Sequence, residues 1–159
     1  MRKGGRFAVV MLLLAVAQYA LRPRLGDPRF APDFLLIALL FLALRTRPAV
    51  GAAAGFLLGL VTDALAPTAF GAAALATTLV GFGAGWVKAL FVADNLLVNA
   101  LFVFSAAWVR DILQMVVSNQ LSGSQLLWQL LIYSPVAALT TAVAALLVRL
   151  VFRGWLDPR

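Results

Sequence analysis

Residues 50–65 read VGAAAGFLLGLVTDAL, an apolar run in which Gly51, Gly55, Gly59 and Asp63 recur at every fourth position. This spacing puts the four residues on one face of an α-helix, because residues i and i+4 lie one above the other. The remaining positions are mostly apolar, as expected of a helix that is surrounded by lipid or by other helices. A stripe of small residues lets a second helix approach closely within a membrane. The pattern therefore predicts a closely packed membrane helix.

The segment that follows, residues 70–87, carries a matching stripe of Ala73, Thr77, Gly81 and Gly85. A short turn containing Pro67 joins the two segments, so we expect an antiparallel hairpin with its small-residue faces in contact. The alternative is that this face receives a helix of a partner protein. The predicted packing or partner-docking residues are Gly51, Gly55, Gly59, Gly81 and Gly85.

The composition of the whole chain indicates a membrane protein. Of its 159 residues, 64% are hydrophobic and only 12% are charged, whereas soluble chains are about 25% charged. Too few charges are present to coat a water-soluble globule, so the excess apolar surface must face lipid. We expect one transmembrane domain over residues 1–159.

The residue types that are missing restrict the chemistry. The chain has no Cys, His or Glu, which excludes disulfides and thiolate chemistry and leaves a zinc ion without its usual ligands. General acid–base catalysis would depend on Asp, Lys or Tyr, which are scarce. We expect no metal, no cofactor and no enzymatic activity.

Apolar runs bounded by Pro, Gly and basic residues predict an all-α bundle of six transmembrane helices, at about 7–21, 33–46, 50–65, 70–87, 96–117 and 126–151. The second run is short, so we expect Arg45 and Arg47 to extend toward the membrane surface. Arg and Lys collect on the cytoplasmic side of membrane proteins, which predicts cytoplasmic termini here. The predicted inner residues are Arg2, Lys3, Arg6, Arg45, Arg47, Lys88, Arg149, Arg153 and Arg159, and the outer ones are Arg22, Arg24 and Arg29. Because these charges flank helices in twos and threes, we expect no nucleic-acid binding.

Three charged residues fall inside predicted helices, namely Asp63, Arg110 and Asp111. Charges at this depth are costly and normally pair or face a cavity. Asp63 and Arg110 are at similar depth, so we expect an ion pair between them that locks two helices together. An aspartyl protease dyad of Asp63 and Asp111 would need a shared proton, and this is disfavoured because Arg110 would keep Asp111 ionised.

A small-molecule pocket is the other alternative for these polar residues. Its candidate lining is Asp63, Asn99, Arg110, Asp111, Gln114, Asn119 and Gln120. Most of these lie toward the outer half of the helix at 96–117, and a channel would need a more continuous polar path.

The order of several short motifs resembles the rod shape-determining protein MreD family. Residues 32–36 read PDFLL, residues 45–48 read RTRP, residues 55–63 read GFLLGLVTD, and Pro67 and then Phe70-Gly71 follow. The resemblance assigns the family motif to Pro32, Asp33, Gly55, Gly59, Asp63 and Gly71.

This resemblance implies a noncatalytic scaffold of cell-wall elongation in the bacterial inner membrane. Members of the family bind MreC and through it connect MreB with RodA and a class B penicillin-binding protein. Their architecture is similar to the substrate-binding subunit of energy-coupling-factor transporters, so a vitamin-type transporter subunit is the alternative function. An intramembrane aspartyl protease is the least favoured.

Overall fold

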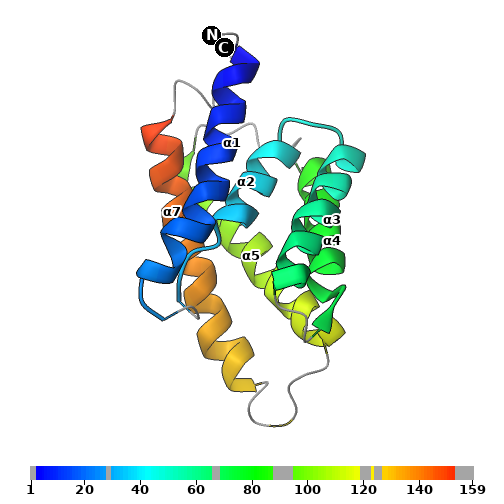
Figure 1. Ribbon diagram of the computed structural model, residues 1–159. Coiled ribbons are helices and arrows are strands. Elements are labelled where there is room, and N and C mark those ends of the chain that lie inside the picture. Colours follow the sequence, from blue (N-terminus) through cyan, green and yellow to red (C-terminus); the bar gives the residue numbers. More distant parts are fainter. Residues whose placement is uncertain are drawn as a thin grey trace.

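The computed structural model describes residues 3–27, 30–65, 69–87, 95–118, 123 and 127–152, and every regular element in these ranges is helical. The elements are α1 (Lys3–Ala20), η1 (Arg22–Arg24), α2 (Phe34–Ala43), α3 (Pro48–Leu65), α4 (Ala72–Val87), α5 (Leu96–Ser118), η4 (Gln129–Tyr133) and α7 (Ser134–Val151) (Figure 1). The π-helical turn η4 runs directly into α7, so the two form one helix. The predicted all-α fold of six helices is confirmed within the described residues.

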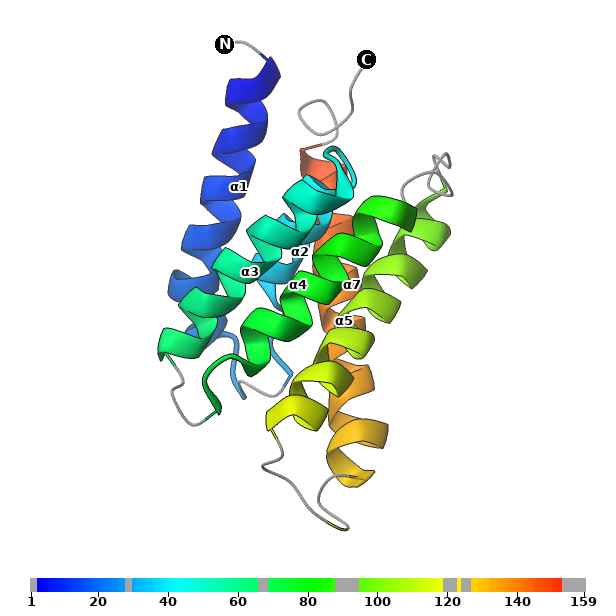
Figure 2. The same ribbon diagram turned by 90° about the vertical axis from the view of Figure 1, so that its right-hand side faces the viewer.

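The helices alternate in direction through the bundle. The start of α1 and the end of α7 lie at the same end, which we call the terminal end, and η1 lies at the opposite end (Figure 2). Within the described ranges, four helices are long and apolar enough to cross a membrane: α1 extended through η1, α3, α5, and η4 with α7. The other two, α2 and α4, are shorter apolar helices.

Helix α2 lies at the centre of the bundle, and its buried residues are Leu35, Leu36, Ile37, Ala38, Leu39, Leu40 and Ala43. Its 10 residues span about 15 Å at about 1.5 Å per residue, roughly half of a hydrocarbon core about 30 Å thick. Predicting a helix over 33–46 was wrong at its C-terminal end. The chain tightens into turns after Ala43, where Arg45 N–H bonds the Leu42 carbonyl, and Pro48 starts the next helix. Since α2 is covered by other helices, it does not need to match the thickness of the lipid.

Helices α3 and α4 form the closest pair in the bundle, and the facing residues are small. A Cβ atom added at Gly51 would overlap the Gly81 carbonyl, and one added at Gly55 would overlap the Thr77 carbonyl. The Thr77 hydroxyl donates to the Gly55 carbonyl across the contact, at 2.6 Å. Gly59 faces Ala74 in the same way, and Gly85 faces Pro48. The small-residue face is therefore occupied within the chain itself.

Asp63 joins the hairpin at its closed end. Its carboxylate accepts hydrogen bonds from the backbone N–H groups of Gly71, Ala73 and Ala74, at 3.0, 3.0 and 2.9 Å. The first N–H groups of a helix have no partner within it, and a negative charge is favourable at that end. Gly71 has a φ of 95°, a conformation that glycine adopts without steric cost. The predicted ion pair between Asp63 and Arg110 is wrong, because the Asp63 carboxylate instead caps α4.

Candidate functional site: a charged pocket

Arg110 of α5 is held by two carboxylates. Its Nη1 atom lies 3.1 Å from Asp33 Oδ2 and 3.2 Å from Asp111 Oδ1. The Arg110 and Asp33 side chains are only 12% and 10% exposed, so the charges are paired where water has little access. Buried charges in membrane segments are expected to pair in this way. The sequence grouped Arg110 with Asp111 and Asp63, and the structure replaces Asp63 by Asp33 as the second carboxylate.

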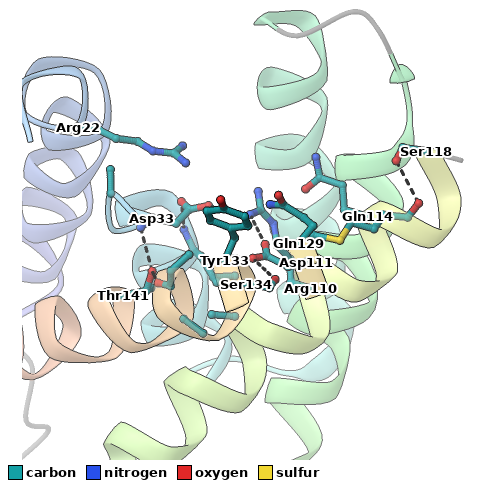
Figure 3. A pocket seen from close by; sticks show the side chains of 16 residues that line it. Arg22, Asp33, Arg110, Asp111, Gln114, Ser118, Gln129, Tyr133, Ser134 and Thr141 are labelled. Carbon is teal, nitrogen blue, oxygen red and sulfur yellow. Dashed lines mark hydrogen bonds and ion pairs between the residues drawn. The ribbon is translucent and has the colours of Figure 1, made fainter. Parts of the chain in front are cut away.

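Asp33 is fixed because it is the N-cap of α2. Its Oδ1 atom accepts the Leu36 N–H at 3.0 Å, which is the usual geometry of a capping aspartate. Its own backbone N–H donates to the Thr141 hydroxyl of α7 at 3.1 Å. The next N–H, of Phe34, donates to Gln18 Oε1 of α1 at 2.9 Å. The start of α2 is thus tied to α1 and α7, and the Asp33 carboxylate is held beside Arg110 (Figure 3).

Asp111 is oriented by the helix that contains η4. Ser134 Oγ donates to Asp111 Oδ2 at 2.8 Å, and Ser134 is 1% exposed. The wide turn of η4 lies just before Pro135, which has no N–H to continue the α-helical pattern. Trp108 Nε1 donates to the Leu130 carbonyl inside this turn, at 3.3 Å. Such π-helical turns are frequent at functional sites, and this one carries two residues of the pocket described next.

A pocket of about 290 Å³ opens around these charges. It lies among η1, α2, α5, η4 and α7, and Figure 3 shows the Arg22 guanidinium reaching toward it from the opposite side to Arg110. Its polar lining residues are Arg22, Asp33, Arg110, Asp111, Gln114, Ser118, Gln129, Tyr133, Ser134 and Thr141. The pocket is therefore polar, although its surroundings are mostly apolar helices.

The hydrogen bonding of the pocket is incomplete. The Arg22 side chain makes no ion pair or hydrogen bond with the described residues, and its buried Nε atom has no partner. Arg110 Nε is also buried without a partner. Buried polar groups are normally satisfied, so these two guanidinium groups stand out. By formal charge, two arginines and two aspartates sum to zero in this pocket.

The structure brings together only part of the candidate pocket lining. Arg110, Asp111 and Gln114 line the pocket, while Asp63 caps α4 and Asn99 lines a separate cavity of about 20 Å³ with Arg149. Pro67, Asn119 and Gln120 lie outside the described residues. The sequence did not indicate that Arg22, Ser134 and Thr141 would join Asp33 here, because no local pattern connects residues so far apart in the chain.

The arrangement of the carboxylates is structural in character. Asp63 binds two N–H groups of α4 and that of Gly71 just before it, and Asp111 binds Arg110 and Ser134. Asp63 and Asp111 are therefore not arranged as the proton-sharing pair of an aspartyl protease. In the ranges that the structure describes, no group of three or more His, Cys, Asp or Glu residues is placed to hold a metal ion.

These features indicate a small α-helical membrane protein: helices of spanning length, a buried central helix, and charges neutralised inside the bundle. The model of the family described as rod shape-determining protein MreD matches residues 1–155. The chain belongs to the MreD family, as the motifs in its first half predicted. No curated protein and no solved structure matches the chain significantly, so the likeness to energy-coupling-factor subunits stays a prediction.

Proposed function

We propose that this protein is a noncatalytic scaffold of the cell-wall elongation machinery, that it resides in the bacterial inner membrane, and that it binds MreC there. The observation that carries the proposal is the match of the MreD family over nearly the whole chain, residues 1–155. Membership of this family supports a role in setting rod shape.

The use of the charged residues supports a scaffold rather than an enzyme. The carboxylates of Asp33, Asp63 and Asp111 are all occupied by cations or by donors that fix one helix on another. Such contacts hold the helices against one another, which supports a structural use of these carboxylates.

The surface available to MreC lies on the outer faces of the helices. The glycine face of α3 is filled by α4, so a partner helix does not dock there. Large apolar side chains are exposed elsewhere, for example Leu12 and Val16 of α1, at 65% and 54%. These faces can pack against lipid or against the helix of a partner.

We place the terminal end of the bundle in the cytoplasm. Figure 2 shows the start of α1, the turn between α2 and α3, and the end of α7 at this end, and these segments carry Arg6, Arg45, Arg47 and Arg149. Among the described residues, the opposite end carries Arg22 and Arg24 of η1. This bias follows the positive-inside rule. In this orientation the charged pocket lies in the outer half of the membrane. MreC would then connect the protein indirectly to MreB inside and to RodA and a class B penicillin-binding protein outside.

Depletion of the protein in its native host tests this function. We expect rods to become round, and a plasmid copy of the wild-type gene to restore them. Rods that keep their shape after clean deletion, in a strain without a second copy, would contradict the proposal. The transporter alternative predicts a different result, namely a vitamin-like metabolite that stays bound to the purified protein and raises its thermal stability.

A further inference from the structure

The pocket contains an unused positive charge. The Arg22 side chain has no hydrogen-bond or ion-pair partner among the described residues, yet its guanidinium extends into a pocket where its Nε atom is shielded from water. A guanidinium offers five N–H donors in a planar fork that matches a phosphate or a carboxylate. The Nε donor is the one that is buried without a partner, and an unbound buried donor is costly, so the site is suited to an anionic group that lies against the Arg22 guanidinium.

The opposite wall of the pocket favours a positive group. Arg110 is shared by Asp33 and Asp111, so these three residues together carry a formal charge of −1. Asp111 is the most open of them, since its side chain is 23% exposed against 10% for Asp33. A free anion would be attracted by Arg22 but repelled by the two carboxylates. A ligand that carries both a negative and a positive group would match both walls.

The size of the pocket agrees with a small polar head rather than a large metabolite. Its volume of about 290 Å³ is at the lower limit of ligand pockets, which are typically about 300–1,000 Å³. Leu21 and Leu25 lie on either side of η1 in the chain and are 51% and 52% exposed. Neither leucine lines the pocket, but both flank the element that carries Arg22, so exposed apolar side chains are available near Arg22 in the chain for the acyl chains of a lipid.

We propose that this pocket binds the zwitterionic head of a membrane phospholipid, with the phosphate on Arg22 and the ammonium group facing Asp111. Gln114 and Gln129, which also line the pocket, supply neutral donors and acceptors for the rest of the head. The bound lipid would fill the space between η1 and the α5–α7 pair. This inference concerns the ligand of the pocket and does not depend on binding of MreC.

Native mass spectrometry of the full-length protein in a mild detergent tests the assignment, with phosphatidylethanolamine, phosphatidylglycerol or free phosphoethanolamine added. We expect one bound phosphatidylethanolamine per protein, in preference to phosphatidylglycerol, which lacks the ammonium group. Arg22→Gln should weaken this binding by about tenfold or more, because a charge-assisted hydrogen bond is lost.

Arg24→Gln is the matched control. It removes the same charge from the same element η1, but Arg24 is exposed and does not line the pocket, so lipid binding should be unchanged. The Arg22 side chain makes no hydrogen bond or ion pair with the described residues, so Arg22→Gln is expected to fold, and thermal unfolding of both variants verifies this.

Several results would overturn the proposal. Equal retention of phosphatidylethanolamine by Arg22→Gln and the wild type would show that Arg22 does not bind the head. Equal binding of phosphatidylglycerol would show that Asp111 does not select a cation, and equally tight binding of free phosphoethanolamine would make a soluble molecule the ligand. Loss of a co-purifying protein from Arg22→Gln, with the lipid retained, would assign the pocket to a carboxylate of that partner.

Discussion

Replacing Gly81 by alanine tests the close contact between α3 and α4. A Cβ atom at this position would overlap the backbone carbonyl of Gly51 on the facing helix. Backbone atoms cannot rotate away as the end of a side chain can, so the two helices would have to separate. Gly83 is the matched control, since it lies on the same helix and a Cβ there meets nothing within 4 Å.

Two contributions to the free energy of unfolding decide the comparison: a gain in helix propensity that both substitutions share, and a cost of overpacking that only one of them has. Exchange of glycine for alanine inside a helix stabilises it by about 0.5–1 kcal/mol, and this gain applies at both positions. Overpacking of a well-packed contact costs about 1–3 kcal/mol, and it applies only to Gly81→Ala. We therefore expect Gly81→Ala to be less stable than Gly83→Ala by about 1–3 kcal/mol, and Gly83→Ala to be at least as stable as the wild type.

Unfolding of the purified proteins in mixed micelles, with increasing sodium dodecyl sulfate, measures this difference. Circular dichroism and tryptophan fluorescence report the transition, and Trp86 of α4 is close to the contact in sequence. If Gly81→Ala and Gly83→Ala unfold at the same detergent fraction, the facing backbones are not in the contact that we describe.

Two further predictions concern the charged residues. Arg110→Gln removes the cation that Asp33 and Asp111 share, so it should destabilise the protein by about 3–5 kcal/mol. In the same unfolding assay, the double variant Asp33→Asn with Arg110→Gln should lose less stability than the sum of the two single losses. Strict additivity of the two losses would contradict the ion pair. Asp63→Asn replaces by a neutral amide a carboxylate that accepts the N–H groups of Gly71, Ala73 and Ala74 at the start of α4. The change should cost about 1–3 kcal/mol and speed hydrogen exchange in the first turn of α4. Unchanged exchange there would contradict the cap.

The parts of the fold that follow from local patterns could be predicted from the sequence. Gly51, Gly55 and Gly59 repeat at the helical period, and their stripe indicated the tight hairpin without knowledge of other contacts. The family motif likewise lies within one stretch of the chain. By contrast, the apolar run of α2 is equally compatible with lipid or with other helices around it. Its central, buried position was therefore not predicted.

The charged pocket could be predicted only in part, because its contacts join distant segments. Depth in the membrane made Asp63 and Arg110 plausible partners, but depth does not fix rotation about a helix axis or the position of a neighbouring helix start. Asp33 was read as the start of a helix, and its ion pair with Arg110 depends on the packing of α2 against α5. Arg22 was assigned to an outer loop, and its approach to the pocket depends on how η1 folds after α1.

Co-purification from native membranes tests the central claim most directly. The tagged protein is extracted from its own host in a mild detergent, with and without prior cross-linking, and the bound proteins are identified and quantified by mass spectrometry. We predict that MreC is recovered in an amount comparable to that of the tagged protein, and that an unrelated tagged membrane protein of similar abundance does not recover it. Absence of MreC from the cross-linked sample, with the tagged protein folded and expressed at its native level, would contradict the assignment as an MreC-binding scaffold.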